Sequence, residues 1–123
     1  MCLETILEGN DLLFVLNKLK SKSIKIVFDT GNRIAHGHKI FDDILILKDK
    51  IEHIHLKDKN MQNENVIMGT GMVNFLEVFS ALKEINFKKT FTFETRRGID
   101  PISTCKFNIN LMNFLYLEAC NEL

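Results

Sequence analysis

The chain alternates between short apolar segments that are typical of strands and longer stretches with the apolar spacing of helices. The strand-like segments span residues 2–4, 24–29, 51–55 and 90–94. A helix between successive strands returns the chain to the same end of a sheet, so this order predicts parallel strands. We therefore expect an α/β fold built from four βα units.

Polar residues mark the starts of three expected helices. Asn10 or Asp11 can cap the first helix, and Asn74 can cap the third. Asp100 followed by Pro101 is typical of a helix start. Backbone N–H groups in the first turn have no partner within the helix, so proline, which has no N–H, loses no hydrogen bond there. We expect the last of these helices to be the longest.

Loops and one short helix separate the other expected elements. The short helix should cover residues 39–48, after a turn at 30–32 and a polar loop. Residues 57–72 form a long polar stretch, and a loop of that length in a compact domain is usually functional or disordered. Five phenylalanines are expected to lie in the core: Phe75, Phe79, Phe87, Phe107 and Phe114.

The composition narrows the class of protein. The 123 residues suffice for one domain, and 16 basic against 16 acidic side chains give a formal net charge of zero. Nucleic-acid binding usually needs a basic face, so it is not expected here. The three cysteines have no paired spacing, which predicts free thiols and a cytoplasmic location. Neither a secretory signal nor an apolar run near the ~20 residues of a membrane span is present.

Each strand-like segment ends in a side chain that can bind a divalent metal. These side chains are Glu4, Asp29, His55 and Glu94. The carboxyl ends of parallel strands lie on one face, so the four should converge on one point. Three carboxylates and one imidazole suit a divalent cation such as Mn²⁺, Mg²⁺, Co²⁺ or Zn²⁺. The alternatives are structural: a turn former at Asp29, a solvated acid at Glu4 or a core histidine at His55. His53 shares its strand face with His55 and is a weaker candidate.

Four sequence blocks resemble a known family. They are FDTGN at 28–32, IHLKD at 54–58, MGTGMVNF at 68–75 and FTFETRRG at 91–98. In this order they are similar to the C-terminal half of the sugar phosphate isomerase/epimerase family, which includes L-ribulose-5-phosphate 3-epimerases and hexulose-6-phosphate isomerases. That family has the xylose-isomerase-like (β/α)₈ TIM barrel. The resemblance implies that residues 1–123 are a partial domain, with strands five to eight present and the N-terminal half absent.

The resemblance also implies roles for single residues. In the family a divalent metal is held at the ends of the last four strands, and the matching positions are the four candidates named above. Glu4 and Glu94 would also act as the acid/base pair. Asn32 stands where the ketose 3-epimerase branch tends to carry a histidine, which favours the branch that acts on phosphorylated sugars. The expected substrate contacts are Asn32, Lys57, Arg96 and Arg97, the last three as cations that could clamp a phosphate.

The implied activity is a divalent-metal-dependent isomerase or epimerase that acts on a sugar or sugar phosphate. It would abstract a proton next to a carbonyl and pass through an enediolate. Two other classes stay open: a non-catalytic fragment or half-barrel association module, and an abasic-site endonuclease, which would need more histidines and a basic face. A four-stranded piece exposes two strand edges, so a complementing N-terminal half or a homo-oligomer is the expected partner.

Overall fold

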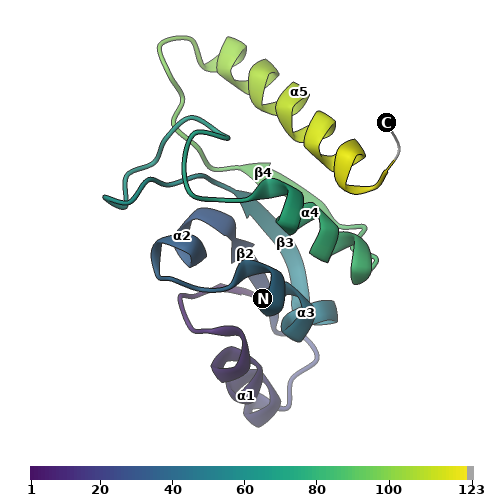
Figure 1. Cartoon of the computed structure of the whole chain (residues 1–123). Helices are drawn as coiled ribbons and strands as arrows, with labels where there is room; N and C mark the ends of the chain where they lie inside the picture. The colour runs from purple at the N-terminus through teal and green to yellow at the C-terminus, as the bar shows by residue number, and fades with distance from the viewer. Residues whose placement is uncertain (122–123) are drawn as a thin grey trace.

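The computed structural model describes residues 1–121 and contains one parallel sheet with helices between its strands (Figure 1). The strands β1 (Cys2–Glu4), β2 (Lys25–Asp29), β3 (Ile51–Leu56) and β4 (Thr90–Phe93) lie in the order β1-β2-β3-β4. The helices are α1 (Gly9–Leu19), α2 (Thr30–Ala35), α3 (Ile40–Leu47), α4 (Phe75–Glu84) and α5 (Pro101–Ala119), with a short 3₁₀ helix at Lys48–Lys50. The predicted α/β fold of four βα units is confirmed.

The two faces of the sheet differ in chemistry. Alternate residues such as Ile26, Phe28 and Ile54 are fully buried and belong to the hydrophobic core that the helices cover. In Figure 1, α3 and α4 lie over the sheet, with α1 at the lower end of the view and α5 at the upper end. The opposite face carries the intervening residues, among them Asp29 and His55, because side chains alternate along a strand. The candidate metal ligands therefore lie on the face that is turned away from the core.

Strand register brings the ends of the inner strands to one level. Asp29 pairs with His55, and His55 pairs with Thr92 in β4. A register shift between Ile26 and Val27 precedes this alignment. Glu94, the first residue after β4, extends the ladder, since its N–H donates to the Leu56 carbonyl (3.1 Å).

The helix starts follow the predicted caps in two of three cases. Asn74 and Asp100 cap α4 and α5 through their side chains, and Pro101 opens α5 as expected. The cap predicted for the first helix is wrong, because α1 begins at Gly9 and its N-cap residue, Glu8, makes no side-chain capping bond. The reason is tertiary: Asp43 of α3 accepts a hydrogen bond from the Gly9 N–H (2.8 Å) and so satisfies the first turn from outside the helix.

The turn predicted at residues 30–32 is also wrong, because this segment forms the helix α2. Asp29 caps it, with Oδ1 accepting the Asn32 N–H at 2.7 Å. The same short sequence favours a turn or a helix start, since Asp is common in both. The helix predicted over 39–48 is present as α3 with the 3₁₀ helix that follows it.

Two of the five phenylalanines predicted for the core do not belong to it. Phe75 and Phe79 are buried and Phe87 is partly buried, whereas Phe107 and Phe114 are 50% and 55% exposed. Both exposed residues lie on α5, which packs along α4 and has Asn108 and Met112 as its buried residues. The apolar residues of α5 are spread around the helix and mixed with polar ones, so the sequence gives no clear signal for the side that is covered.

The long loop between β3 and α4 is organised around Asp58, which is fully buried. Its carboxylate accepts four backbone N–H bonds of 2.8–3.1 Å, from Lys59, Gly69, Gly71 and Val73. A β-carbon at Gly71 would lie 2.3 Å from Asp58 Oδ1, so glycine is required there. The loop predicted at residues 57–72 is therefore held in one conformation by Asp58, which lies two residues after the end of β3.

Two further expectations concern membrane segments and cysteines. Within residues 1–121, the structure contains no helix that is both long and apolar enough to span a membrane. Cys2, Cys105 and Cys120 are all free thiols, as predicted, and only the last of the three is buried.

Candidate metal centre

Glu4, Asp29, His55 and Glu94 come together at the carboxyl ends of the four strands. One potential ligand atom from each lies within 4.8 Å of the others. Three of these residues are the last or last-but-one residues of β1, β2 and β3, and Glu94 follows β4 directly. The structure thus brings together all four residues that the strand pattern singled out.

The imidazole of His55 stands among the three carboxylates. Its Nδ1 is 3.0 Å from Glu94 Oε2, 3.4 Å from Glu4 Oε2 and 3.8 Å from Asp29 Oδ2. The Asp29 side chain is 2% exposed, whereas those of Glu4 and Glu94 are 40% and 53% exposed. The cluster therefore has a buried base and an open front through which a small molecule could approach.

Two atoms at the base of the cluster are suited to holding a cation. Asp29 Oδ2 and His55 Nδ1 are buried and lie 3.8 Å apart, with Lys57 Nζ 2.9 Å from the first atom and Glu94 Oε2 3.0 Å from the second. Together with one oxygen each from Glu4 and Glu94, these two atoms form a compact set of four potential metal donors. Oxygen and imidazole donors fit Mn²⁺, Mg²⁺, Co²⁺ or Zn²⁺. We conclude that the residues present fit a divalent metal.

The short helix α2 orients two of the four candidate ligands. Its cap bond fixes Asp29 Oδ1 on the Asn32 N–H and so turns Oδ2 toward the cluster. The side chain of Asn32 reaches across to β1, where Nδ2 donates to Glu4 Oε1 (3.2 Å). Asn32, predicted from the sequence as a substrate contact, thus supports Glu4 in this structure.

Lys57 lies inside the cluster rather than in a solvated loop. Its Nζ is 2.9 Å from Asp29 Oδ2 and 2.9 Å from Glu94 Oε2, and its side chain is 8% exposed. Burial lowers the pKa of the Lys57 ammonium, but the hydrogen bonds to the two carboxylates outweigh burial and leave the pKa raised. The hydrogen bond from Lys57 likewise holds the pKa of Glu94 below its usual value. Both groups are therefore charged at neutral pH.

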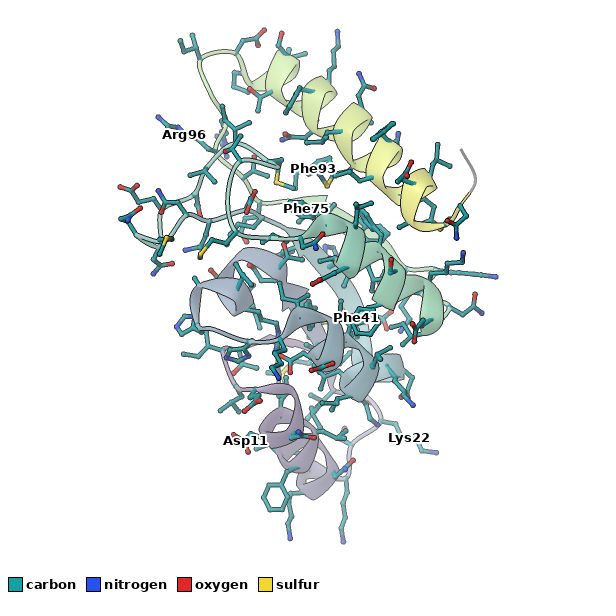
Figure 2. The ribbon with its side chains drawn as sticks, viewed as in Figure 1. Asp11, Lys22, Phe41, Phe75, Phe93 and Arg96 are labelled. Atoms are coloured by element: carbon teal, nitrogen blue, oxygen red, sulfur yellow. The ribbon has the colours of Figure 1, made fainter. Side chains whose placement is uncertain are left out.

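Arg96 and Arg97 are exposed and follow Glu94 in the loop between β4 and α5. Figure 2 shows Arg96 at the loop end of the molecule, far from the labelled Asp11 and Lys22 near α1. Both arginines line an open hollow that also includes Glu94 and Asn65 of the long loop. This position is compatible with the predicted contact to a phosphorylated substrate, which stays a prediction.

His53 does not join the cluster, although it lies on the same face of the same strand as His55. Its Nε2 is hydrogen-bonded to Thr92 Oγ1 at 2.7 Å, and the ring packs edge-on against His55 (5.2 Å between centroids). His53 therefore bonds Thr92 and lies two residues earlier along β3 than His55, outside the cluster.

A buried ion pair behind α2 was not predicted from the sequence. Arg33 is 1% exposed, pairs with the buried Asp43 and lies over the Phe28 ring at 4.4 Å. Arg33 Nη1 also donates to the Leu7 carbonyl (3.2 Å), which ties the loop after β1 to α2. No spacing in the sequence indicates this pair, because its members are ten residues apart and belong to different helices.

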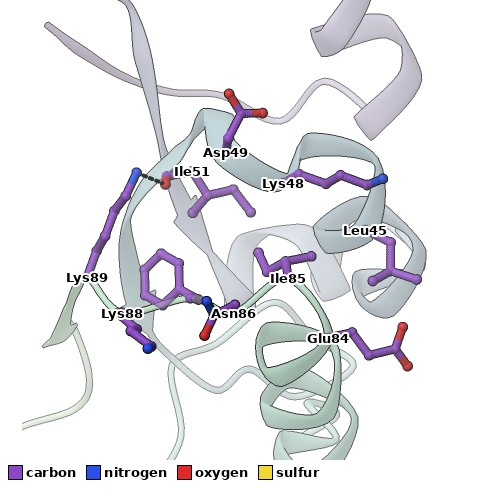
Figure 3. Close-up of a pocket in the computed structure, with 10 residues that line it drawn as sticks. Leu45, Lys48, Asp49, Ile51, Glu84, Ile85, Asn86, Lys88 and Lys89 are labelled. Carbon is purple, nitrogen blue, oxygen red and sulfur yellow. Dashed lines mark hydrogen bonds between the residues drawn. The ribbon is translucent and has the colours of Figure 1, made fainter.

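A separate hollow lies at the opposite end of the strands (Figure 3). It measures about 580 Å³ and is lined by residues at or just before the starts of β3 and β4, including Lys48, Ile51, Phe87 and Lys89. Lys89 Nζ donates to the Ile51 carbonyl there at 2.9 Å. None of the four clustered residues lines it. In a parallel α/β sheet, function is expected at the carboxyl ends of the strands, so we place the candidate site at the cluster.

Comparison with known proteins agrees with this geometry. The family model for the xylose isomerase-like TIM barrel matches residues 2–110. The chain belongs to this family. The family resemblance expected from the sequence blocks is thereby confirmed, and the four βα units correspond to half of the barrel.

Three similar proteins illustrate the relationship. A putative L-ribulose-5-phosphate 3-epimerase of Haemophilus influenzae is 34% identical over 83 residues, which are 60% of this chain and 29% of that protein. An L-ribulose 3-epimerase structure aligns with a TM-score of 0.80 at 16% identity, over 94% of this chain and 43% of that one. The IOLI protein with a bound zinc atom aligns with a TM-score of 0.66 at 20% identity, over 92% and 43%. The chain thus spans less than half the length of the relatives that it matches.

Proposed function

We propose that this chain carries the metal-binding half of an isomerase or epimerase that acts on a sugar or sugar phosphate. The observation that supports this most directly is the cluster of Glu4, Asp29, His55 and Glu94, whose potential ligand atoms all lie within 4.8 Å of one another. Membership of the xylose isomerase-like family, whose structural neighbours include sugar epimerases, supports the same class of activity. We further propose a cytoplasmic location, in keeping with the free cysteines.

The proposed chemistry is proton transfer at the carbon next to a carbonyl. A divalent ion bound here would stabilise the negative charge that develops on the substrate oxygens. Glu94 is ionised, half exposed and at the open front of the cluster, so its carboxylate can take the proton from carbon. Glu4 also contacts His55 Nδ1 but comes from β1, at the opposite edge of the sheet from β4, and can return a proton to the opposite face.

The proposed substrate contacts lie around the open front. Asn32 and Lys57 border the carboxylates, and Arg96 and Arg97 stand on the adjoining loop. An arginine pair favours a phosphorylated sugar, because the guanidinium fork matches phosphate oxygens. The other wall of the pocket would come from outside these four βα units.

The activity is best tested in a complete barrel. The chain is joined to the first half of a relative such as the putative L-ribulose-5-phosphate 3-epimerase and incubated with Mn²⁺ and a panel of pentulose and hexulose phosphates in D₂O. We expect deuterium to enter the sugar next to its carbonyl. Cleavage of abasic-site DNA without any sugar turnover would move the protein to the endonuclease class.

The strand edges favour a second candidate function, that of a module which associates with another half barrel. β1 and β4 form the two edges of the sheet, and α5 exposes large apolar side chains. These are Ile102, Phe107, Ile109, Phe114, Tyr116 and Leu117. Unpaired edges and apolar patches attract partners, so we propose that a complementing half or a second copy covers them.

This association predicts the size of the chain in solution. Sedimentation velocity on the 123-residue chain should show a dimer or a larger species, because an isolated sheet would leave both edges unpaired. Addition of a separately made N-terminal half should shift the population to the mixed complex. A stable, folded monomer that ignores the other half would contradict the proposed association.

A further inference from the structure

Lys57 reaches the carboxylates along a path that the fold builds for it. Thr30 holds the lysine backbone, with Oγ1 accepting from the Lys57 N–H (3.0 Å) and donating to the Lys57 carbonyl (2.7 Å). The side chain then crosses Gly31, where a β-carbon would lie 2.7 Å from Lys57 Cγ. A larger residue at position 31 would push the side chain aside, so the local sequence directs the ammonium into the cluster.

The ammonium occupies two oxygens that a metal would use. Lys57 Nζ is 2.9 Å from Asp29 Oδ2, one of the two buried atoms at the base of the cluster. It is also 2.9 Å from Glu94 Oε2, the atom that lies nearest to His55 Nδ1. Because the lysine side chain is almost fully buried, water does little to screen its charge from an incoming cation.

We infer that Lys57 is a built-in counter-cation, which holds the carboxylates together without a metal and lowers the affinity of the centre for one. This inference rests on the proposed metal-dependent function and concerns a positioning residue, since Lys57 acts through Asp29 and Glu94. It differs from the phosphate contact predicted from the sequence. A fixed positive charge beside the ligands makes binding of a second cation less favourable, and it also prevents the empty carboxylates from repelling one another.

The test is direct titration of the 123-residue chain with Mn²⁺ by calorimetry. Lys57→Met should bind Mn²⁺ about tenfold more tightly than the parent, because the competing charge is lost while the stem volume is kept. Lys57→Arg keeps the charge and should bind no more tightly than the parent. Mn²⁺ should also raise the melting temperature of Lys57→Met by more than that of the parent, since tighter binding to the folded state stabilises it more.

Two further variants sharpen the comparison. Lys59→Met removes a cation two residues away whose Nζ binds Asn63 Oδ1 (2.7 Å), and its Mn²⁺ affinity should equal that of the parent. Gly31→Ala displaces the Lys57 side chain without removing its charge and should shift the affinity in the same direction as Lys57→Met. If Lys57→Met does not fold, the two single variants Gly31→Ala and Lys57→Gln provide the test instead.

The outcomes separate this inference from the proposed function. If the parent binds Mn²⁺ and Lys57→Met binds it equally or more weakly, the counter-cation role is wrong while the metal centre stands. If neither protein binds Mn²⁺, the metal-dependent function itself is overturned, and the role of Lys57 with it.

Discussion

Replacing Glu94 with glutamine in the joined barrel should abolish deuterium exchange at the carbon next to the sugar carbonyl. The amide is close in size to the carboxylate but cannot accept a proton, so the rate should fall by about 100-fold or more. The fold should survive, because the Glu94 side chain is half exposed and its backbone N–H keeps its bond to Leu56. Nuclear magnetic resonance measures the deuterium exchange, and circular dichroism checks that the variant is folded.

Glu52→Gln is the matched control for this variant. Glu52 is also a glutamate of the sheet, and it also pairs with a lysine, Lys89, but at the far end of β3. Its loss should leave the exchange rate unchanged. Exchange at the parent rate in Glu94→Gln would remove Glu94 from the mechanism and would point to Glu4 as the base.

Removing His55 or Asp29 should weaken Mn²⁺ binding to the 123-residue chain by about 100-fold or more. Each substitution to alanine deletes one of four donors, and even changes to outer partners of metal ligands commonly cost 10–100-fold. Calorimetry should show about one site in the parent, because one atom from each of the four residues lies within a single 4.8 Å cluster. Parent-like binding in both variants would rule out the cluster as the metal centre.

His53→Ala provides the control on the same strand. Its imidazole lies two residues from His55, on the same face, but it bonds Thr92 and stands outside the cluster. We expect this variant to lose that hydrogen bond and to keep the Mn²⁺ affinity of the parent. A large loss of affinity in His53→Ala would place the metal one layer deeper than we propose.

The fold and the cluster were largely predictable from the sequence because both depend on local signals. Strand-like segments and the caps at Asn74 and Asp100 have short-range causes, and parallel topology then brings the strand ends together. The convergence of Asp29 and His55 follows from that topology without knowledge of any contact. The register shift in β2 lies between Ile26 and Val27, before the aligned pair, so it leaves the pairing of Asp29 with His55 intact.

The errors arose where a distant partner decided the outcome. The start of α1 depends on Asp43, which lies 34 residues away from Gly9 in the chain. The burial of Lys57 depends on the absence of a side chain at Gly31, which belongs to α2, after the neighbouring strand β2. The exposure of Phe107 and Phe114 depends on which side of α5 meets α4. Residue type alone does not encode these contacts.

The six-residue helix α2 makes two of the candidate ligands depend on one another. The Asn32 backbone N–H donates to Asp29, and the Asn32 side chain donates to Glu4. One residue therefore orients carboxylates from two strands. Unwinding of this single turn and a half would release both acids together. Formation and loss of the centre would then be cooperative: both carboxylates would leave together, and neither would be lost alone.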